Sequence, residues 1–394
     1  MTLSVQRLTM LVFFLQPIVF GSWLPRIPEV QTMLGLGPAG LAIALLGLPC
    51  GTLVTLPFAG PLVGRIGPRQ ALFIGFLFYT VAICLPALAP NPILLFVALM
   101  LVGSAMSFTE LGLNVLADTV EKSTGSMIMT TSHGCWSVGI MAGSLIGSGF
   151  AALGLKGALA IPLLAVIMLP LVLLNTRALP AQAAAADPVP GQRAGWTLPS
   201  WALIGICLFV FGITMTEGAM ADWSAIFLRD ALGAESGAAG LGYSVFAAMV
   251  AAGRFGGDTL KKRFGAVNTA RLCGSFALLG AVILFFAGTT PVALLGFAVI
   301  GFGVSVGFPL AVTAAASLTD RPAASNVATL SFVALLGFLI GPPVIGFLAQ
   351  MFDMRLGLLA LVPVLLLSLL LTGRLRVKPT QPIHNPESQI PGVL

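Results

Sequence analysis

Twelve segments of this chain are long and apolar enough to cross a lipid bilayer as helices. A spanning helix needs about 20 mostly apolar residues, because the hydrocarbon core is about 30 Å thick. Hydrophobic residues make up 58% of the 394 residues and charged residues 8%, against about 25% charged in a soluble domain. We therefore expect an all-α membrane protein, with spans at roughly 8–25, 38–60, 70–89, 92–117, 126–151, 157–176, 199–221, 237–258, 267–288, 291–318, 322–350 and 354–374.

Two stretches of the chain lack a spanning run. Residues 177–198 are rich in Ala, Pro and Gln, and residues 377–394 are polar and rich in Pro. Such compositions are typical of linkers and of disordered tails. The predicted organisation is therefore an N-terminal six-helix bundle at 1–176, a cytoplasmic linker at 177–198, a C-terminal six-helix bundle at 199–376 and a disordered cytoplasmic tail at 377–394.

The basic residues are distributed unevenly between the two sides of the membrane. Of the 19 Lys and Arg residues, only Arg26, Lys156, Arg229 and Arg355 fall on one side, and the remaining fifteen fall on the side of the termini. Cytoplasmic loops carry the excess of Lys and Arg, so both termini are predicted to be cytoplasmic. The net charge of +6 is explained by this pattern, and we expect no nucleic-acid partner.

The two halves of the chain also resemble each other. A shift of 198 residues places Arg65-Ile66-Gly67 on Arg263-Phe264-Gly265, and Gly143 on Gly341. Transporters built from two parallel repeats bind their solute between the halves, near the middle of the membrane. The sequence therefore predicts two pseudo-symmetric six-helix bundles with a solute site between them.

The loop between the second and third spans, GPLVGRIGPR at 60–69, resembles the signature of the major facilitator superfamily. It differs in having Gly64 where the family usually has Asp. The resemblance implies the major facilitator fold and secondary transport by alternating access. Arg254 and Asp258 lie four residues apart in the second half, a spacing that favours an ion pair on a helix. We assign Arg65, Arg69, Arg254 and Asp258 to a cytoplasmic gate.

A narrower resemblance lies in the fourth span. Glu110-Leu-Gly-Leu-Asn114 resembles the acidic motif of the fucose permease branch, which holds proton-coupled sugar symporters, and two further stretches, WLPRIP at 23–28 and HGCWSVG at 133–139, resemble related bacterial inner-membrane permeases. The resemblance implies that Glu110 takes part in proton coupling or sugar binding. The first span lacks the second acid of that branch, and Gln16 is its only strongly polar interior residue.

Ionisable residues inside spans are rare and usually face the interior of the bundle. Glu110 lies about 18 residues, or roughly 27 Å, into its span, and His133 lies about 10 Å into the next. We predict that Glu110 and His133 face one polar cavity and carry the coupling proton. A static hydrogen-bonded pair that only joins helices is the alternative.

Four polar or aromatic residues are candidates for solute binding. Asn114 lies one turn beyond Glu110 on the same face, and Trp136 is placed to stack on a sugar ring, with ordinary packing as the alternative. Gln16 and Asn326 complete the set. Glycines at 139, 143 and 147 repeat every four residues in the fifth span, a spacing that lets helices pack closely.

Charged residues near the other membrane surface suggest a second gate. Arg26 ends the first span, while Glu217 and Asp222 lie near the end of the seventh. We predict a periplasmic gate in which Arg26 pairs with Glu217 or Asp222. Anchoring at the membrane interface is the alternative.

These features indicate a permease of a bacterial inner membrane that takes up a sugar or polyol together with protons. Proton-linked efflux of a metabolite or drug is the alternative, and a membrane sensor that does not transport is a further one. The sequence contains no Walker loop, HExxH site or GxSxG elbow, so we expect no enzyme activity, no metal and no cofactor beyond the proton gradient. The expected partners are a small-molecule substrate and the lipid bilayer, and the expected state is a monomer.

Overall fold

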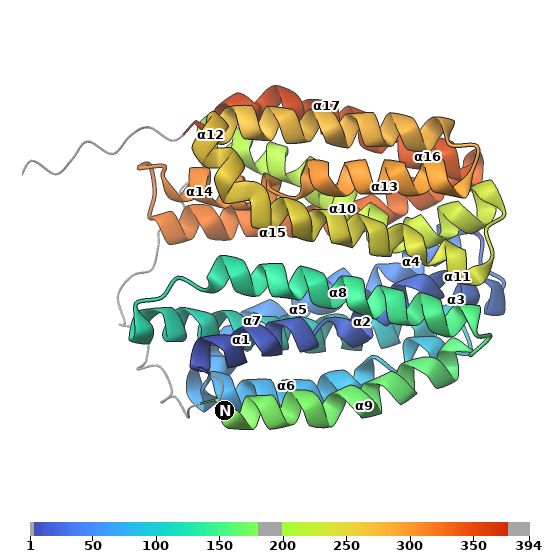
Figure 1. Cartoon of the computed structure of the whole chain (residues 1–394), viewed down its shortest axis with the longest axis horizontal. Coiled ribbons are helices and arrows are strands. Elements are labelled where there is room, and N and C mark those ends of the chain that lie inside the picture. The colour runs from blue at the N-terminus through green and yellow to red at the C-terminus, as the bar shows by residue number, and fades with distance from the viewer. Residues whose placement is uncertain (1–3, 180–198, 377–394) are drawn as a thin grey trace, which may run out of the picture.

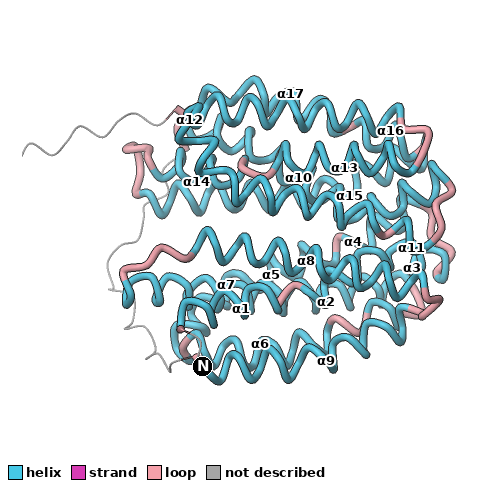
Figure 2. Tube along the Cα trace, in the orientation of Figure 1, coloured by secondary structure: helices cyan, strands magenta, loops and turns pink. Residues whose placement is uncertain are grey.

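The structure, a computed structural model, describes residues 4–179 and 199–376. The predicted tail and nearly all of the predicted linker lie outside these residues. Every regular element in the described part is a helix (Figure 2). Eleven helical runs are long and apolar enough to cross a membrane, and one of them, Ser236–Phe286, has 51 residues. A break at Gly265 divides this run into two crossings, so the predicted count of twelve agrees with the structure.

The first half contains six crossings. Their elements are α1 (Val5–Leu15), α2 (Ile18–Trp23), η1 (Leu24–Arg26), α3 (Ile27–Met33), α4 (Pro38–Leu45), α5 (Gly47–Ile66), α6 (Pro68–Ala82), η2 (Pro86–Leu88), α7 (Pro92–Thr124), α8 (Met129–Ala152) and α9 (Gly157–Ala178). The first crossing runs from α1 to α3, and the second combines α4 with α5.

The second half repeats this plan. Its elements are α10 (Trp201–Leu232), α11 (Ser236–Ala239), α12 (Leu241–Phe286), α13 (Thr290–Val304), α14 (Gly307–Ala316), α15 (Ala323–Met351), α16 (Met354–Leu359), α17 (Leu361–Leu371) and η3 (Thr372–Leu375). Figure 1 shows the halves as two groups of helices, with α3 and α11 at one end of the bundle and the described ends of the chain at the other.

Two glycines mark equivalent turns in the halves. Gly265 interrupts α12 with φ 77° and ψ 163°, and Gly67 separates α5 from α6 with φ 81° and ψ 152°. Residues with a Cβ atom rarely adopt these conformations. Without the turn, the 46 residues of α12 would form a rod of about 69 Å, roughly twice the thickness of the bilayer core. The predicted repeat is thus visible in the backbone.

Close contact between α8 and the first crossing depends on small residues, as the spacing of its glycines predicted. A methyl group at Gly139 would collide with the carbonyl oxygen of Phe14, and one at Gly143 would collide with that of Ile18. Gly147 continues the same line, where an added methyl group would collide with Ser22 of α2 and Pro25 of η1. Helices that approach this closely gain van der Waals contact along their backbones.

The second half has an equivalent contact between α15 and α10. A methyl group at Gly337 would lie 2.9 Å from the carbonyl oxygen of Phe211 and would collide with the Thr214 hydroxyl. At Gly341 it would lie 3.2 Å from the carbonyl oxygen of Met215. Each half is therefore fastened internally by glycines on its fifth crossing.

The two halves meet mainly at the end that carries α3 and α11. Arg229 of α10 reaches across to α3, where its Nη1 donates to the carbonyl oxygen of Pro28 at 2.7 Å and to Thr32 Oγ1 at 3.2 Å. Its Nη2 donates to Gln31 Oε1. A charged donor with three acceptors on the opposite half is a strong contact, so this end of the bundle is closed.

Contacts between α8 and α12 extend the closure toward the middle of the bundle. Ser244 Oγ donates to Ser144 Oγ at 2.8 Å, and Arg254 Nη1 donates to Ser137 Oγ at 2.8 Å. Among the described residues, no hydrogen bond joins the halves nearer to the chain ends than this last one.

The predicted pairing of Arg26 with Glu217 or Asp222 is wrong. Arg26 is nearly buried, and its Nη1 lies 3.0 Å from Glu29 Oε2 within the same crossing. Glu29 also accepts a hydrogen bond from the backbone of Gly157 at 2.8 Å. The short η1 turn places the two charges three residues apart on one face, so Arg26 stays within the first half and Arg229 makes the contact between halves.

Substitution of Gly143 by Ala tests the packing of α8 against the first crossing. We expect a loss of about 1–3 kcal/mol in stability, because the added methyl group meets backbone that must move. The measurement is the Tm of the detergent-purified protein. Gly149→Ala is the matched control on the same helix, where nothing lies within 4 Å of the added Cβ. Equal Tm values for the two variants would contradict this packing.

Replacing Arg229 with Ala should open the closed end more often. Hydrogen bonds to charged groups contribute about 1.5–3 kcal/mol each, and 1.4 kcal/mol corresponds to about a tenfold change in population. We expect faster labelling of a cysteine at Ser144, in a cysteine-free background, by an impermeant maleimide added on the α3–α11 side. Arg355→Ala is the control, since Arg355 donates to Phe285 within its own half at 2.9 Å. If Arg229→Ala and Arg355→Ala accelerated the labelling equally, Arg229 would not be the residue that keeps this end closed.

Candidate functional site

A cavity of about 310 Å³ lies between the two halves, near the middle of the crossings. This volume falls within the range of about 300–1,000 Å³ typical of small-molecule sites. Its walls come from α2, α4, α5, α7 and α8 of the first half and from α10, α12 and α15 of the second. The structure therefore has a cavity between the halves, where the sequence predicted the solute site.

The cavity contains most of the charged groups found deep in the bundle. Its lining includes three carboxylates, Glu110, Glu217 and Asp222, and one guanidinium, that of Arg254. Glu110 comes from the first half and the other three come from the second. Charged groups at this depth usually face a water-filled cavity or a partner, and here both arrangements occur.

Arg254 and Glu217 form the ion pair of the cavity wall. Arg254 Nη2 lies 3.3 Å from Glu217 Oε1, and the side chains are 18% and 16% exposed. The predicted pairing of Arg254 with Asp258 is therefore wrong. Arg254 turns from α12 toward α10 and α8, whereas Asp258 is exposed one turn further along α12. A buried charge needs a compensating charge, so Arg254 pairs more favourably with the largely buried Glu217 of α10 than with the exposed Asp258.

Glu110 is exposed and lines the cavity, together with Ser107 one turn earlier on the same helix. None of the hydrogen bonds between described side chains involves it. It projects from the middle of α7 and therefore offers a free carboxyl group to whatever enters the cavity.

His133 does not share the cavity lining with Glu110, contrary to the prediction. Its Nε2 lies 3.1 Å from Asn114 Oδ1, and its ring meets that of Phe13 edge to face with centroids 5.4 Å apart. His133 and Asn114 thus join α8 to α7 beside the cavity. Asn114, predicted to bind solute, is occupied by this contact instead of lining the cavity.

Trp136 and Gln16 are brought together as a pair. Trp136 Nε1 donates to Gln16 Oε1 at 2.8 Å, and Gln16 is buried. Trp136 lines the cavity, whereas Gln16 supports it from behind. Because the hydrogen bond fixes the edge of the indole ring, the ring presents a defined apolar surface to the cavity.

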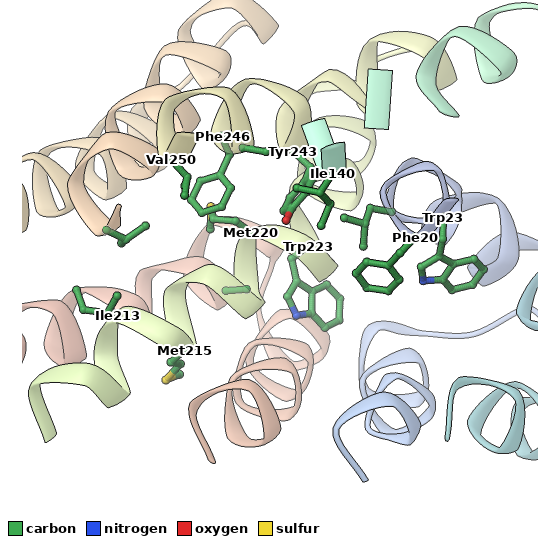
Figure 3. Packing of buried hydrophobic residues seen from close by; sticks show 14 of the residues in the cluster. Phe20, Trp23, Ile140, Ile213, Met215, Met220, Trp223, Tyr243, Phe246 and Val250 are labelled. Atoms are coloured by element: carbon green, nitrogen blue, oxygen red, sulfur yellow. The ribbon is translucent and has the colours of Figure 1, made fainter. Parts of the chain in front are cut away.

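Further aromatic rings surround the same space. Phe20 and Trp23 come from the first half, and Tyr243, Phe246 and Phe338 come from the second. Figure 3 shows Phe20 and Trp23 on α2 and Tyr243 and Phe246 on α12, with Trp223 of α10 between the two pairs. Most of the cavity surface is therefore apolar, and the charged groups are few and localised.

Asn326 lies away from the cavity, at the end of the bundle with the chain ends. Its Nδ2 donates to Asp320 Oδ1 at 3.1 Å, and its side chain is buried. Hydrogen bonds from Ser200 and Asn326 hold the pKa of Asp320 below its usual range. This cluster joins the start of α10 to the start of α15, so Asn326 has a structural contact within its own half.

Arg65 and Arg69 also lie at the end with the chain ends. Arg65 is exposed, and Arg69 Nη2 donates to the carbonyl oxygen of Arg177 at 2.6 Å. This contact joins the start of α6 to the end of α9 within the first half. Neither residue makes a hydrogen bond to the second half in the described part of the chain.

Sequence reasoning missed Tyr243 as a cavity residue and Arg229 as the contact between halves. Arg229 did carry a signal, since it is one of only four basic residues on the sparse side of the predicted topology. Tyr243 carried the signal of a polar aromatic residue inside an apolar span. Within residues 4–179 and 199–376, no group of three His, Cys, Asp or Glu side chains is arranged to hold a metal ion.

Comparisons with known proteins agree with this architecture. The family model described as Major Facilitator Superfamily matches residues 9–334. An uncharacterized MFS-type transporter of Yersinia pestis is 32% identical over 354 residues, which covers 89% of this chain and 90% of that protein.

Two crystal structures share the fold at 14% sequence identity. A mutant of the nucleoside transporter NupG superposes with a TM-score of 0.75 over 95% of this chain and 100% of that one. A bacterial homologue of the human lysosomal transporter Spinster, inward-facing and unoccupied, superposes with a TM-score of 0.72 over 95% of this chain and 98% of that one. This chain therefore belongs to the major facilitator superfamily, as a multi-pass membrane transporter and not an enzyme.

Proposed function

We propose that this transporter takes up a small polar solute, similar to a sugar or polyol, together with protons across a bacterial inner membrane. The observation that carries the proposal is Glu110, a carboxyl group without a hydrogen-bond partner among the described side chains, open to the central cavity. The halves then rock about this site, so that it faces each side of the membrane in turn.

A carboxyl group in this position suits proton coupling. When ionised, Glu110 needs water or a cation beside it, because an unpaired charge is unfavourable in a closed, dry cavity. When protonated, it is neutral and able to hydrogen-bond to a solute as the cavity closes. Coupling follows if the loaded cavity closes only with the proton in place. His133 lies one helix away, against Asn114, and we assign it a supporting role.

The lining of the cavity suits a hydroxylated solute. Thr52, Ser107 and Ser137 add hydroxyl groups to the carboxylates, and Tyr243 adds a phenol. Sugars and polyols offer hydroxyl edges to such groups and apolar faces to aromatic rings such as that of Trp136.

Proton-linked efflux of an apolar metabolite or drug is the second candidate. The observation in its favour is that most residues lining the cavity are aromatic or aliphatic, among them Phe20, Phe246, Phe338 and Met106. Such surfaces bind amphipathic compounds without needing a full set of hydrogen-bond donors.

The predicted topology also assigns the closed end of the bundle to one side of the membrane. If both termini are cytoplasmic, the end closed by Arg229 is periplasmic and the cavity faces the cytoplasm. Arg229, Gln31 and Thr32 then form the periplasmic gate in place of Arg26. Residues 177–198 would connect the bundles on the cytoplasmic side, and a monomer suffices because the cavity is formed within one chain.

Glu110→Gln tests the proton coupling. We expect the variant to lose accumulation driven by an acidic exterior, down to the level of protein-free liposomes, because an amide cannot carry the proton. Solute exchange at equal pH should persist, since exchange needs no net proton movement. The measurement is uptake into proteoliposomes of the sugar or polyol that most raises the Tm of the purified protein.

Asp118→Asn is the control for this variant. Asp118 is on the same helix but does not line the cavity, and its Oδ2 lies 2.6 Å from Lys122 Nζ. Unchanged pH-driven accumulation by Glu110→Gln would refute the coupling role. Movement of the solute against the direction of proton flow, in place of uptake with the protons, would replace uptake with the efflux candidate.

A further inference from the structure

The charges that line the cavity do not balance. Glu110, Glu217 and Asp222 supply three carboxylates, whereas Arg254 is the only basic side chain among the described residues that line the cavity. Arg254 is already engaged with Glu217. Two carboxyl groups therefore remain without a cation, Glu110 on the first half and Asp222 on the second.

Alternating access makes this imbalance consequential. While the cavity is open, water solvates both free carboxylates. When the halves close around a solute, that water is largely removed, and uncompensated charges in a dry interior are strongly unfavourable. The closed, loaded state is thus favoured when two positive charges have entered the cavity.

One of these charges is the coupling proton already assigned to Glu110. We propose that the second is carried by the solute itself, a small molecule with one protonated amine that Asp222 binds. This inference rests on the proposed function and narrows its solute class. The proton neutralises Glu110 and the ammonium group neutralises Asp222. A neutral solute would require a second proton, on Asp222, and an anion would require a third positive charge.

The surroundings of the two carboxyl groups support this assignment. Aromatic rings attract cations to their faces, with Trp and Tyr more effective than Phe. The cavity is lined by Trp23, Trp136 and Tyr243. Asp222 lies on α10, little more than one turn after Glu217, so the ion pair with Arg254 occupies the adjacent part of the wall and leaves Asp222 available.

The position of Arg254 sharpens the selectivity. A solute carboxylate could be attracted to its guanidinium, but both Nη atoms of that group already have partners: Nη2 donates to Glu217 Oε1 at 3.3 Å and Nη1 donates to Ser137 Oγ at 2.8 Å. An anion would have to share this guanidinium with the carboxylate of Glu217, which repels it. A cation meets free carboxylates and needs to displace only water.

The experiment compares matched compounds that differ only in charge. The Tm of the purified protein is measured with glucosamine, glucose and glucuronate, with tryptamine, indole-3-ethanol and indole-3-acetate, and with benzylamine, benzyl alcohol and benzoate. We expect the amine of at least one series to raise Tm by about 2–4 °C or more over the neutral and anionic members. The inference is overturned if no amine exceeds its neutral partner in any series, including the case in which no amine stabilises the protein.

Variants at position 222 test whether Asp222 is the residue that produces the preference for the amine. Asp222→Asn should abolish the preference for the amine, and Asp222→Glu should retain it. Asp258→Asn is the matched control, because Asp258 is an exposed acid of α12 outside the cavity. An amine preference that survives in a folded Asp222→Asn protein would refute the role of Asp222. If that variant does not fold, the charge series on the unaltered protein still decides the solute class.

Failure of this inference can be told apart from failure of the proposed function. A neutral sugar that binds best and accumulates in a Glu110-dependent manner would reject the amine and keep the coupling. An amine that binds best but accumulates equally in Glu110→Gln would reject the coupling and keep the solute class.

Discussion

A lipid bilayer offers no hydrogen-bond partners, and this constraint governs the arrangement of the chain. Backbone groups must pair within helices, so the described residues form helices joined by short turns. The same constraint applies to charged side chains, which need partners inside the protein. Arg229 finds its acceptors on α3, Arg254 finds Glu217, and Arg26 finds Glu29. Glu110 and Asp222 are the exceptions, and both face the cavity.

Features that depend on neighbouring residues along one helix were predictable from the sequence. Apolar length set the crossings, which agree with the helices to within a few residues at most boundaries. Glycines four residues apart indicated the face of α8 that meets the first crossing, because this spacing leaves a groove whatever helix fills it. The 198-residue shift aligned Gly67 with Gly265, and both adopt the same unusual backbone conformation.

Partners on other helices were not predictable in the same way. The spacing of Arg254 and Asp258 allowed a local pair, but the rotation of α12 turns Arg254 toward Glu217, which lies 37 residues earlier. Likewise, Glu110 and His133 lie at comparable depths, yet α8 directs His133 to Asn114 instead of the cavity. Which face of a helix points to the centre depends on crossing angles and packing, and depth along the helix does not determine it.

The glycine contacts of α8 have a mechanical consequence. Because the backbone of α8 touches that of α1 and α2 at Gly139 and Gly143, these helices cannot slide or rotate past one another without steric collision. We therefore expect α1, α2 and α8 to move together. Helix α8 also carries Ser137 and Ser144, which touch α12. A displacement of α12 against α8 would therefore be passed on to α1 and α2 as well.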